Sequence, residues 1–171
     1  GLHFNACRRA HVSGVTGIPG EFQRISVLTT SVVLSTRRCS YLPQMPSTLI
    51  VGRGRMGTAL AAALRQAGAE VRGPLGRGEP IQEADVVLLC VPDREIAAAA
   101  ATIPSGPLVG HVSASAPLDL LAPHERFSLH PLLSVVGAGA QFAGAYCAID
   151  GSSAAALDAA RGLAERLSMR V

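Results

Sequence analysis

A glycine-rich segment with the spacing of a nucleotide-binding loop begins at Gly52. Its six residues follow the pattern Gly-x-Gly-x-x-Gly and are Gly52, Arg53, Gly54, Arg55, Met56 and Gly57. In dinucleotide-binding proteins the first glycine allows a sharp turn, the second lets the backbone approach a pyrophosphate, and the third lets a helix pack closely on a strand. The pattern alone is weak evidence, because a glycine-rich turn can also bind nothing, so it needs a strand before it and a helix after it.

The residues after the next expected strand bear on which dinucleotide binds. NAD-binding proteins place an acidic residue about 20 residues after the glycines to accept the ribose hydroxyls, whereas NADP-binding proteins offer arginine to the 2′-phosphate. Here Arg72 and Arg77 occupy this region, and no acid occurs between Val71 and Glu79. A guanidinium can pair with phosphate through two parallel hydrogen bonds. The sequence therefore predicts NADP bound by Arg72 and Arg77; alternatively, both arginines are ordinary solvated charges.

A second group of polar residues follows the apolar segment 85–91. We expect Val91, Pro92 and Asp93 to flank the nicotinamide half of the cofactor, because they come directly after a strand that ends beside the glycine loop. Asp93 is also a plausible N-cap for a helix over residues 94–101. Capping is the simpler interpretation of this carboxylate.

Two histidines and a serine stand where later strands are expected to end. His111 and Ser113 follow one apolar segment, and His130 closes the next. Histidine can exchange protons near neutral pH, so these three residues are candidate catalytic residues, with His130 as a general acid/base or a donor to a substrate carboxylate. A histidine that only forms structural hydrogen bonds is the alternative. A hydrolase triad is disfavoured, because the sequence has no Gly-x-Ser-x-Gly segment.

The order of apolar segments predicts the elements that position these residues. Strands are expected over 48–51, 69–73, 85–91, 108–112, 126–130 and 144–149, and helices over 55–67, 94–101 and 152–167. Residues 74–80 are expected to form a loop, and a short helical turn is expected over 118–121. Alternating strands and helices predict an α/β fold with a doubly wound, mainly parallel sheet and helices on both faces. In such a sheet the ligand lies at the carboxyl ends of the strands, where the candidate residues stand.

Composition narrows the function classes. The 171 residues carry a formal charge of only +3, and 49% of them are hydrophobic. This balance is typical of a globular enzyme-like domain and argues against nucleic-acid or membrane partners. The four cysteines form no Cys-x-x-Cys pair and no metal-ligand spacing, so we expect no metal site and a cytoplasmic location. All basic residues are arginine, which excludes a catalytic lysine within this sequence.

Residues 1–44 differ from the rest of the chain. They contain five arginines, a single acid at Glu21 and scattered serine and threonine. This composition predicts an irregular or disordered leader, with at most a stray strand over 27–34. Three origins remain open: an organelle transit peptide, a flexible tail, or an extension upstream of a natural start at Met45. We favour the upstream extension, because Met45 stands just before the first strand.

Five blocks of the sequence, in order, resemble one known family. The blocks are Gly52–Gly57, Ala84–Asp93, His111–Ser115, Ser128–Leu132 and Phe142–Ala145. The chain resembles the Rossmann-like NADP oxidoreductase family of the 6-phosphogluconate dehydrogenase superfamily, whose members carry a C-terminal helical companion domain of unknown function. Pyrroline-5-carboxylate reductase and prephenate dehydrogenase are more distantly similar. The resemblance covers residues 45–171.

The resemblance implies a nicotinamide dinucleotide site on a Rossmann domain over residues 45–171. It also implies a homodimer formed by the helical domain and a small-molecule substrate cleft between the two domains. That helical domain is not among the 171 residues, so we expect a Rossmann domain truncated near its C-terminal end. One position departs from the family, which usually has glycine after the serine of the third block. Ala114 stands there and would crowd the nicotinamide or the substrate.

These observations predict an NADP-dependent oxidoreductase domain. It would transfer hydride between the nicotinamide and a small carbonyl, imine or hydroxy-acid substrate, with His111, Ser113 and His130 on the substrate side. Two alternatives remain open. The chain could be a non-catalytic dinucleotide-binding or redox-sensing module, or an inactive fragment of a two-domain reductase that exposes an apolar edge over residues 152–171.

Overall fold

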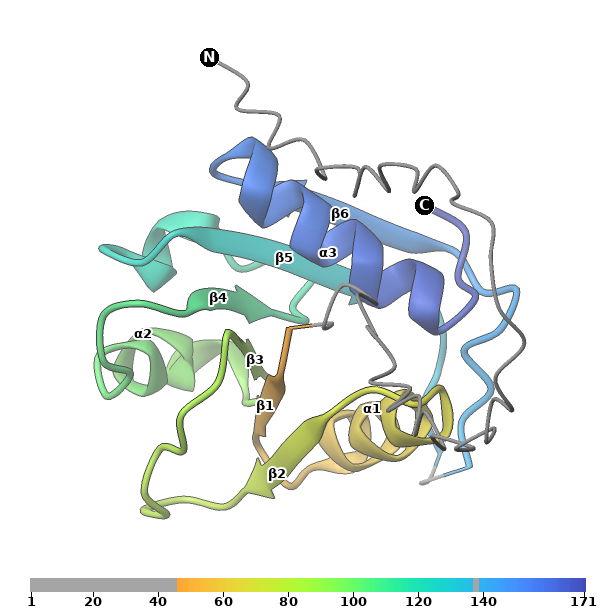
Figure 1. Cartoon of the computed structure of the whole chain (residues 1–171), viewed down its shortest axis with the longest axis horizontal. Helices are drawn as coiled ribbons and strands as arrows, with labels where there is room; N and C mark the ends of the chain where they lie inside the picture. Colours follow the sequence, from red (N-terminus) through yellow and green to blue (C-terminus); the bar gives the residue numbers. More distant parts are fainter. Residues whose placement is uncertain (1–45, 137–138) are drawn as a thin grey trace, which may run out of the picture. The chain divides into compact units, whose positions relative to one another are not determined.

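The structure is a computed structural model that describes residues 46–136 and 139–171, and the expectations for residues 1–44 lie outside it. One sheet of six strands forms its centre, in the order β2-β1-β3-β4-β5-β6 (Figure 1). The strands are β1 (Thr48–Val51), β2 (Val71–Leu75), β3 (Val86–Leu89), β4 (Leu108–His111), β5 (Arg126–Pro131) and β6 (Cys147–Gly151). The first five are parallel, and β6 runs antiparallel to β5.

Among the described residues, two α-helices and two 3-10 turns lie between strands, and a third α-helix follows β6. They are α1 (Arg55–Gln66), η1 (Asp93–Glu95), α2 (Ile96–Ala100), η2 (Leu118–Leu121) and α3 (Ala154–Arg166). The predicted doubly wound α/β fold is therefore confirmed. The strand order reverses direction between β1 and β3, which makes this the switch point where such sheets bind ligands.

The helices cover both faces because successive strand residues point to opposite sides. Ile50 and Leu88 pack with α1 and α3 in one core cluster. Their neighbours Leu49 and Leu89 pack with α2 and η2 in the other. Both faces of the central strands are thus apolar, which explains why residues 85–91 read as one continuous hydrophobic run.

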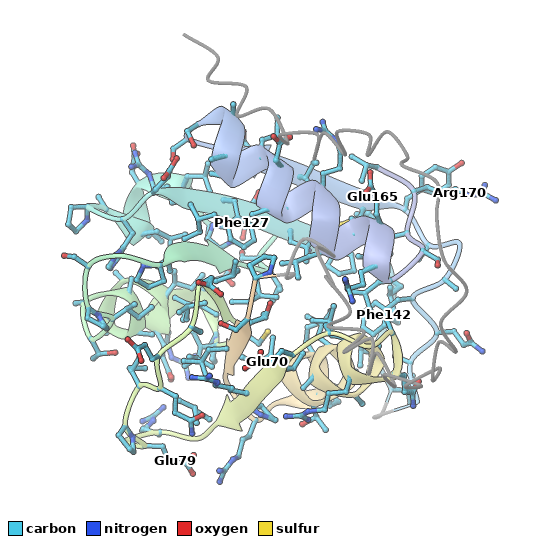
Figure 2. The ribbon with its side chains drawn as sticks, in the orientation of Figure 1. Glu70, Glu79, Phe127, Phe142, Glu165 and Arg170 are labelled. Carbon is cyan, nitrogen blue, oxygen red and sulfur yellow. The ribbon has the colours of Figure 1, made fainter. Side chains whose placement is uncertain are left out.

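The contact between β4 and β5 depends on a residue without a side chain. Gly110 pairs with Phe127, whose ring is fully buried. A Cβ at Gly110 would lie 2.4 Å from that ring, so a larger residue would displace it. Phe127 points into the core shared with α3, where Figure 2 shows it on β5. The small residue lets the largest buried side chain fill the space under the helix.

Two strands lie further along the chain than predicted. β2 extends to Leu75, so Pro74 and Leu75 belong to the strand rather than to the expected loop. Leu75 is buried, and its carbonyl accepts a 2.8 Å hydrogen bond from the Gly52 amide. β6 begins at Cys147 rather than Gly144, because its register is set by antiparallel pairing with β5.

The C-terminal segment packs against the sheet rather than exposing an apolar edge. The predicted periodic residues of α3, namely Ala156, Ala160, Leu163 and Leu167, are all buried. Ser153 caps the helix by accepting a 3.1 Å hydrogen bond from the Ala156 amide. The interpretation of residues 152–171 as an exposed apolar surface is therefore wrong, because β6 brings α3 back over β5. In the described part of the chain, no helix is long and apolar enough to cross a membrane.

The close approach of α1 to the glycine loop gives a first prediction. A Cβ at Gly57 would lie 2.0 Å from the Gly52 carbonyl oxygen, so Gly57→Ala must force the helix away from the turn. We expect this variant to lower the free energy of unfolding by about 1–3 kcal/mol in urea denaturation.

Gly162 in α3 is the matched control, because a Cβ there meets nothing within 4 Å. Gly162→Ala should raise the free energy of unfolding by roughly 0.5–1 kcal/mol, as expected for a helix interior. Equal effects of the two substitutions would contradict the close contact at Gly57.

Candidate functional site

The turn after β1 brings three segments together at the carboxyl edge of the sheet. Gly52 has a φ of +116°, a conformation that favours glycine, and a Cβ there would lie 2.3 Å from the Cys90 carbonyl oxygen. The Cys90 amide in turn donates a 2.7 Å hydrogen bond to Val51. The ends of β1 and β3 are therefore locked side by side, with α1 starting directly above them.

Gly54 differs from the other two motif glycines because its missing side chain faces open space. A Cβ at Gly54 would meet nothing within 4 Å. Gly54 is also the N-cap residue of α1, so no serine or aspartate side chain stands where one would usually cap the helix. The start of α1 therefore offers its backbone N–H groups and its partial positive charge to an outside anion.

A pocket of about 630 Å³ opens in front of this turn. Gly52, Arg53 and Gly54 form one wall, and the loop after β2 forms another with Gly76 and Arg77. The remaining wall comes from residues that follow β3 and from the segment of η1 and α2. These residues are Cys90, Val91, Pro92, Glu95, Ala98, Ala99 and Thr102. The volume falls within the range typical of small-molecule and cofactor sites.

A second pocket of about 390 Å³ lies on the other side of Gly54. It shares Gly54, Cys90, Val91 and Pro92 with the first pocket. Arg55, Met56, Val112 and Val135 complete it. The two pockets therefore meet at the start of α1, and together they form a site with two lobes on either side of the glycine loop. The predicted residues Gly52 to Met56, Val91 and Pro92 are brought together here.

Two arginines, Arg53 and Arg77, line the first lobe. Arg77 pairs with Glu95 at 2.8 Å, and 85% of the Arg77 side chain is exposed. Arg53 forms an ion pair with Glu79 and donates from Nε to the Pro74 carbonyl at 3.0 Å. Two guanidinium groups therefore stand at this lobe, and each of them is already paired with a carboxylate.

Arg72, which was predicted to bind NADP together with Arg77, does not line the lobe that Arg77 lines. Its guanidinium donates to the Glu83 carbonyl and pairs with Glu70 at 3.2 Å. It lines a different pocket, together with Ser47 and Asp85 from the amino ends of strands. The physical reason is strand alternation and the irregular β1–β2 register, which direct this side chain away from the glycine loop.

Asp93 does not cap a helix as expected. Its segment starts with the 3-10 turn η1, whose N-cap is Pro92. The Asp93 carboxylate instead accepts a 2.9 Å hydrogen bond from the Ser115 hydroxyl. Hydrogen bonds from Ser113 and Ser115 hold the pKa of Asp93 below its usual 3.8. Asp93 therefore ties the start of η1 to the loop after β4.

Ser113 shapes that loop through its side-chain oxygen. The hydroxyl accepts hydrogen bonds from the Ser115 amide at 3.1 Å and the Ala116 amide at 3.0 Å. These bonds hold residues 113–116 in a tight turn beside Asp93. Ser113 does not line either lobe of the site, so the geometry gives it a positioning role.

His111 is fully buried on the α2 side of the sheet. It pairs in register with Leu89, and neither ring nitrogen has a hydrogen-bond partner among the described residues. Burial lowers the pKa of His111 below its usual 6.5, although the nearby Asp93 carboxylate acts in the opposite direction. The ring is therefore neutral at pH 7 and lies behind the turn that Ser113 forms, outside both lobes.

His130 stands at the carboxyl end of β5 and is half-buried. Its Nδ1 lies 2.9 Å from the Val112 carbonyl oxygen, which can only accept a hydrogen bond. Nδ1 therefore carries the proton, and in the neutral ring Nε2 holds the lone pair. Val112 also lines the second lobe, so His130 is adjacent to that lobe without forming part of its wall.

Several residues of the site were not predicted. They are Arg53 as an ion-pair partner, Glu79, Glu95, and the wall formed by Ala98 and Ala99 of α2 with Thr102 after it. The alanine-rich run 97–101 could have indicated a close approach, because small residues leave room for a ligand.

Cys90 is buried, and burial raises the pKa of its thiol to about 12. No cluster of His, Cys, Asp or Glu in the described ranges could hold a metal ion.

Solved structures of oxidoreductases share this fold. A Bacteroides fragilis protein described as an NADP oxidoreductase superposes with a TM-score of 0.61 and 18% identity, over 73% of this chain and 58% of that one. Prephenate dehydrogenase from A. aeolicus, in complex with hydroxyphenyl propionate and NAD+, gives 0.59 and 19%, over 74% and 58%. Pyrroline-5-carboxylate reductase from Streptococcus pyogenes gives 0.55 and 14%, over 74% and 57%. Neither a family model nor a curated protein matches the sequence.

The predicted similarity to these three kinds of protein is confirmed at the level of the fold. The chain has a Rossmann-like fold, and it spans a little under three-fifths of the length of each of these structures. Because the identities are below one fifth, the comparisons bear on architecture. The chemistry must be argued from the site itself.

The buried His111 gives a second prediction. Its pKa is lower in the folded protein than in the unfolded chain, so below about pH 6.5 the unfolded chain binds the extra proton more readily. The neutral ring therefore makes its full contribution to the free energy of unfolding above about pH 6.5, and this contribution is lost as the pH falls.

As the pH is lowered from about 7 to about 5, we expect the free energy of unfolding to fall less steeply for His111→Leu than for the parent. Urea denaturation at each pH measures this slope. The carboxyl of Asp93 contributes in a separate window, because its lowered pKa affects stability only as the pH falls below about 3.8. An unchanged pH slope in the variant would show that His111 is not buried neutral.

Proposed function

We propose that this chain is the dinucleotide-binding domain of an NADP-dependent oxidoreductase. The observation that carries the proposal is the two-lobed site that meets at the start of α1. A dinucleotide has two nucleoside halves joined by a pyrophosphate, so a site with two lobes and an anion-binding centre fits its shape.

The central part of the site suits a pyrophosphate. Gly54 leaves room in front of the helix, and the first amides of α1 have no capping side chain from that residue. The pyrophosphate would lie against Gly54, Arg55 and Met56, which line the second lobe where the two lobes meet. Helix partial charge and backbone N–H groups would both stabilise its negative charge.

The first lobe suits an adenosine that carries a 2′-phosphate. Arg77 lines this lobe and is largely exposed, so its guanidinium can turn toward a ligand. Arg53 belongs to the wall formed by the glycine loop, and its guanidinium lies close to Gly76. Two guanidinium groups at one end of a lobe favour a phosphate dianion over the ribose hydroxyls of NAD. This supports NADP through Arg77 and Arg53, and Arg72 has no part in it.

The second lobe would hold the nicotinamide. A bound nicotinamide supplies hydride chemistry, and the protein contributes orientation and proton exchange. Val112 and Val135 give this lobe apolar walls against which the ring would pack. His130, fixed by the Val112 carbonyl, would use Nε2 to take a proton from a substrate hydroxyl or return one to a carbonyl or imine. The substrate would be a small carbonyl, imine or hydroxy acid.

A second candidate is a dinucleotide-binding module without catalysis. The placement of His111 and Ser113 outside both lobes favours it, since two of the three candidate catalytic residues then serve the fold. Turnover separates the two functions, because a binding module would hold NADPH without oxidising it.

Cofactor preference gives a third prediction. Arg77→Gln should raise the dissociation constant for NADPH roughly tenfold, because a charge-assisted phosphate contact is lost, and should change that for NADH less than about twofold. Both constants can be measured by nucleotide fluorescence. Arg72→Gln is the matched control and should leave both unchanged, since Arg72 faces another pocket. A larger effect at Arg72 than at Arg77 would contradict this placement of the 2′-phosphate.

Proton exchange gives a fourth prediction. Against a panel of small 2-oxo acids and cyclic imines, we expect NADPH oxidation by the parent chain with at least one substrate. His130→Gln should lower kcat by roughly 10²–10⁴-fold and leave the dissociation constant of NADPH unchanged. Tight NADPH binding with no turnover across the panel would favour the non-catalytic module instead.

A further inference from the structure

Two carboxylates stand at the arginine end of the first lobe, and the oxidoreductase proposal gives them no role. Glu95 lines the lobe and pairs with Arg77 at 2.8 Å. Glu79 pairs with Arg53 close to Gly76, which lines the lobe together with Arg53. Figure 2 shows Glu79 on the loop beyond the end of β2, whereas Glu70 lies near the start of that strand. The pairs therefore occupy the place where a 2′-phosphate would bind.

The two members of the Arg77–Glu95 pair differ in how firmly they are held. The Arg77 side chain is 85% exposed, so it can move with little loss of packing. The Glu95 side chain is only 30% exposed and belongs to the short turn that leads into α2. If Arg77 turns toward a phosphate, the Glu95 carboxylate remains in the wall. Arg94 is the only other cation near it among the described residues, with Nη2 3.9 Å away.

The Arg53–Glu79 pair has a similar arrangement. Arg53 is anchored by its Nε bond to the Pro74 carbonyl, so its other nitrogens are left for Glu79 or for a ligand. A Cβ at Gly76 would lie 3.3 Å from both Arg53 Nη1 and Glu79 Oε1. Glycine at this position therefore brings the pair against the lobe, where a phosphate would meet both the guanidinium and the carboxylate.

We infer that Glu95 and Glu79 set the cofactor discrimination of this site by competing with the 2′-phosphate for Arg77 and Arg53. The inference rests on the proposed NADP function. Binding of NADP(H) must break or share both ion pairs, and each carboxylate then faces a phosphate dianion of like charge. NAD(H) has no 2′-phosphate, so it leaves both pairs intact. The carboxylates thus weaken NADP(H) selectively and bring the two affinities closer together.

The test compares nucleotide affinities in charge-neutral variants of the full chain. Dissociation constants for NADPH and NADH are measured by fluorescence for the parent, Glu95→Gln, Glu79→Gln and the double variant. Each single substitution should lower the dissociation constant for NADPH roughly two- to fivefold, because one exposed ion pair contributes a free energy of that size. The dissociation constant for NADH should change less than about twofold. The double variant should show the largest NADPH preference.

Glu70→Gln is the matched control, because it removes the same charge from the Arg72 pair outside the lobe. It should leave the NADPH to NADH ratio unchanged, which separates a local effect from the change in net charge. Thermal unfolding checks that each variant folds. If Glu95→Gln does not fold, the comparison of Glu79→Gln with the parent still tests the inference.

Three outcomes would overturn the inference. An unchanged ratio in both single variants, with NADPH still bound, would reject the role of the carboxylates and leave the NADP proposal standing. Weaker NADH binding in the variants would show that the carboxylates hold ribose hydroxyls instead. Absence of saturable binding of either nucleotide to the parent would reject both the inference and the proposed function.

Discussion

The geometry of the carboxyl edge depends on how closely α1 approaches the turn that follows β1. A Cβ added at Gly57 would lie 2.0 Å from the Gly52 carbonyl oxygen. A Cβ added at Gly52 would lie 2.3 Å from the Cys90 carbonyl oxygen. Without side chains at these two positions, β1, β3 and α1 meet at one point. Because the helix begins there, its first amides open onto the space between the two lobes. The candidate site is therefore a consequence of backbone packing before any ligand contact is considered.

The parallel sheet then determines which side chains lie near that point. All strands from β1 to β5 end at the same edge of the sheet, so residues as distant in the sequence as Arg77, Pro92 and His130 lie at that edge. Alternation along each strand selects among them. Val112 faces the α1 side and lines a lobe, whereas His111 lies on the α2 side with both ring nitrogens unpartnered among the described residues. Neighbouring residues thus have different roles: one forms the wall and the other supports it.

Much of the fold could be predicted because apolar runs and glycine spacing are local signals. The strand before Gly52, the helix after it and the buried periodicity of α3 follow from residue patterns. Both β2 and β6 were predicted, but their bounds could not be, since tertiary pairing fixes them. The Leu75 carbonyl accepts a hydrogen bond from the Gly52 amide, and β6 takes its register from β5. The same limit explains Arg72. Its type suited a phosphate, but strand alternation decides the direction of its side chain, and the irregular register was not visible in the sequence. The ion pairs of Glu79 and Glu95 join residues on different elements, so no spacing rule indicates them.

The central claim is that a dinucleotide pyrophosphate binds at the start of α1. Backbone amide chemical shifts, followed by NMR as NADPH is added to the isotope-labelled chain, test it most directly. The account predicts saturable shifts that are largest at Gly54, Arg55 and Met56, with further changes at Arg77 and little change at Gly106, which lines the pocket away from the glycine loop. Saturable shifts confined to the region of Gly106, with none at the start of α1, would contradict the account.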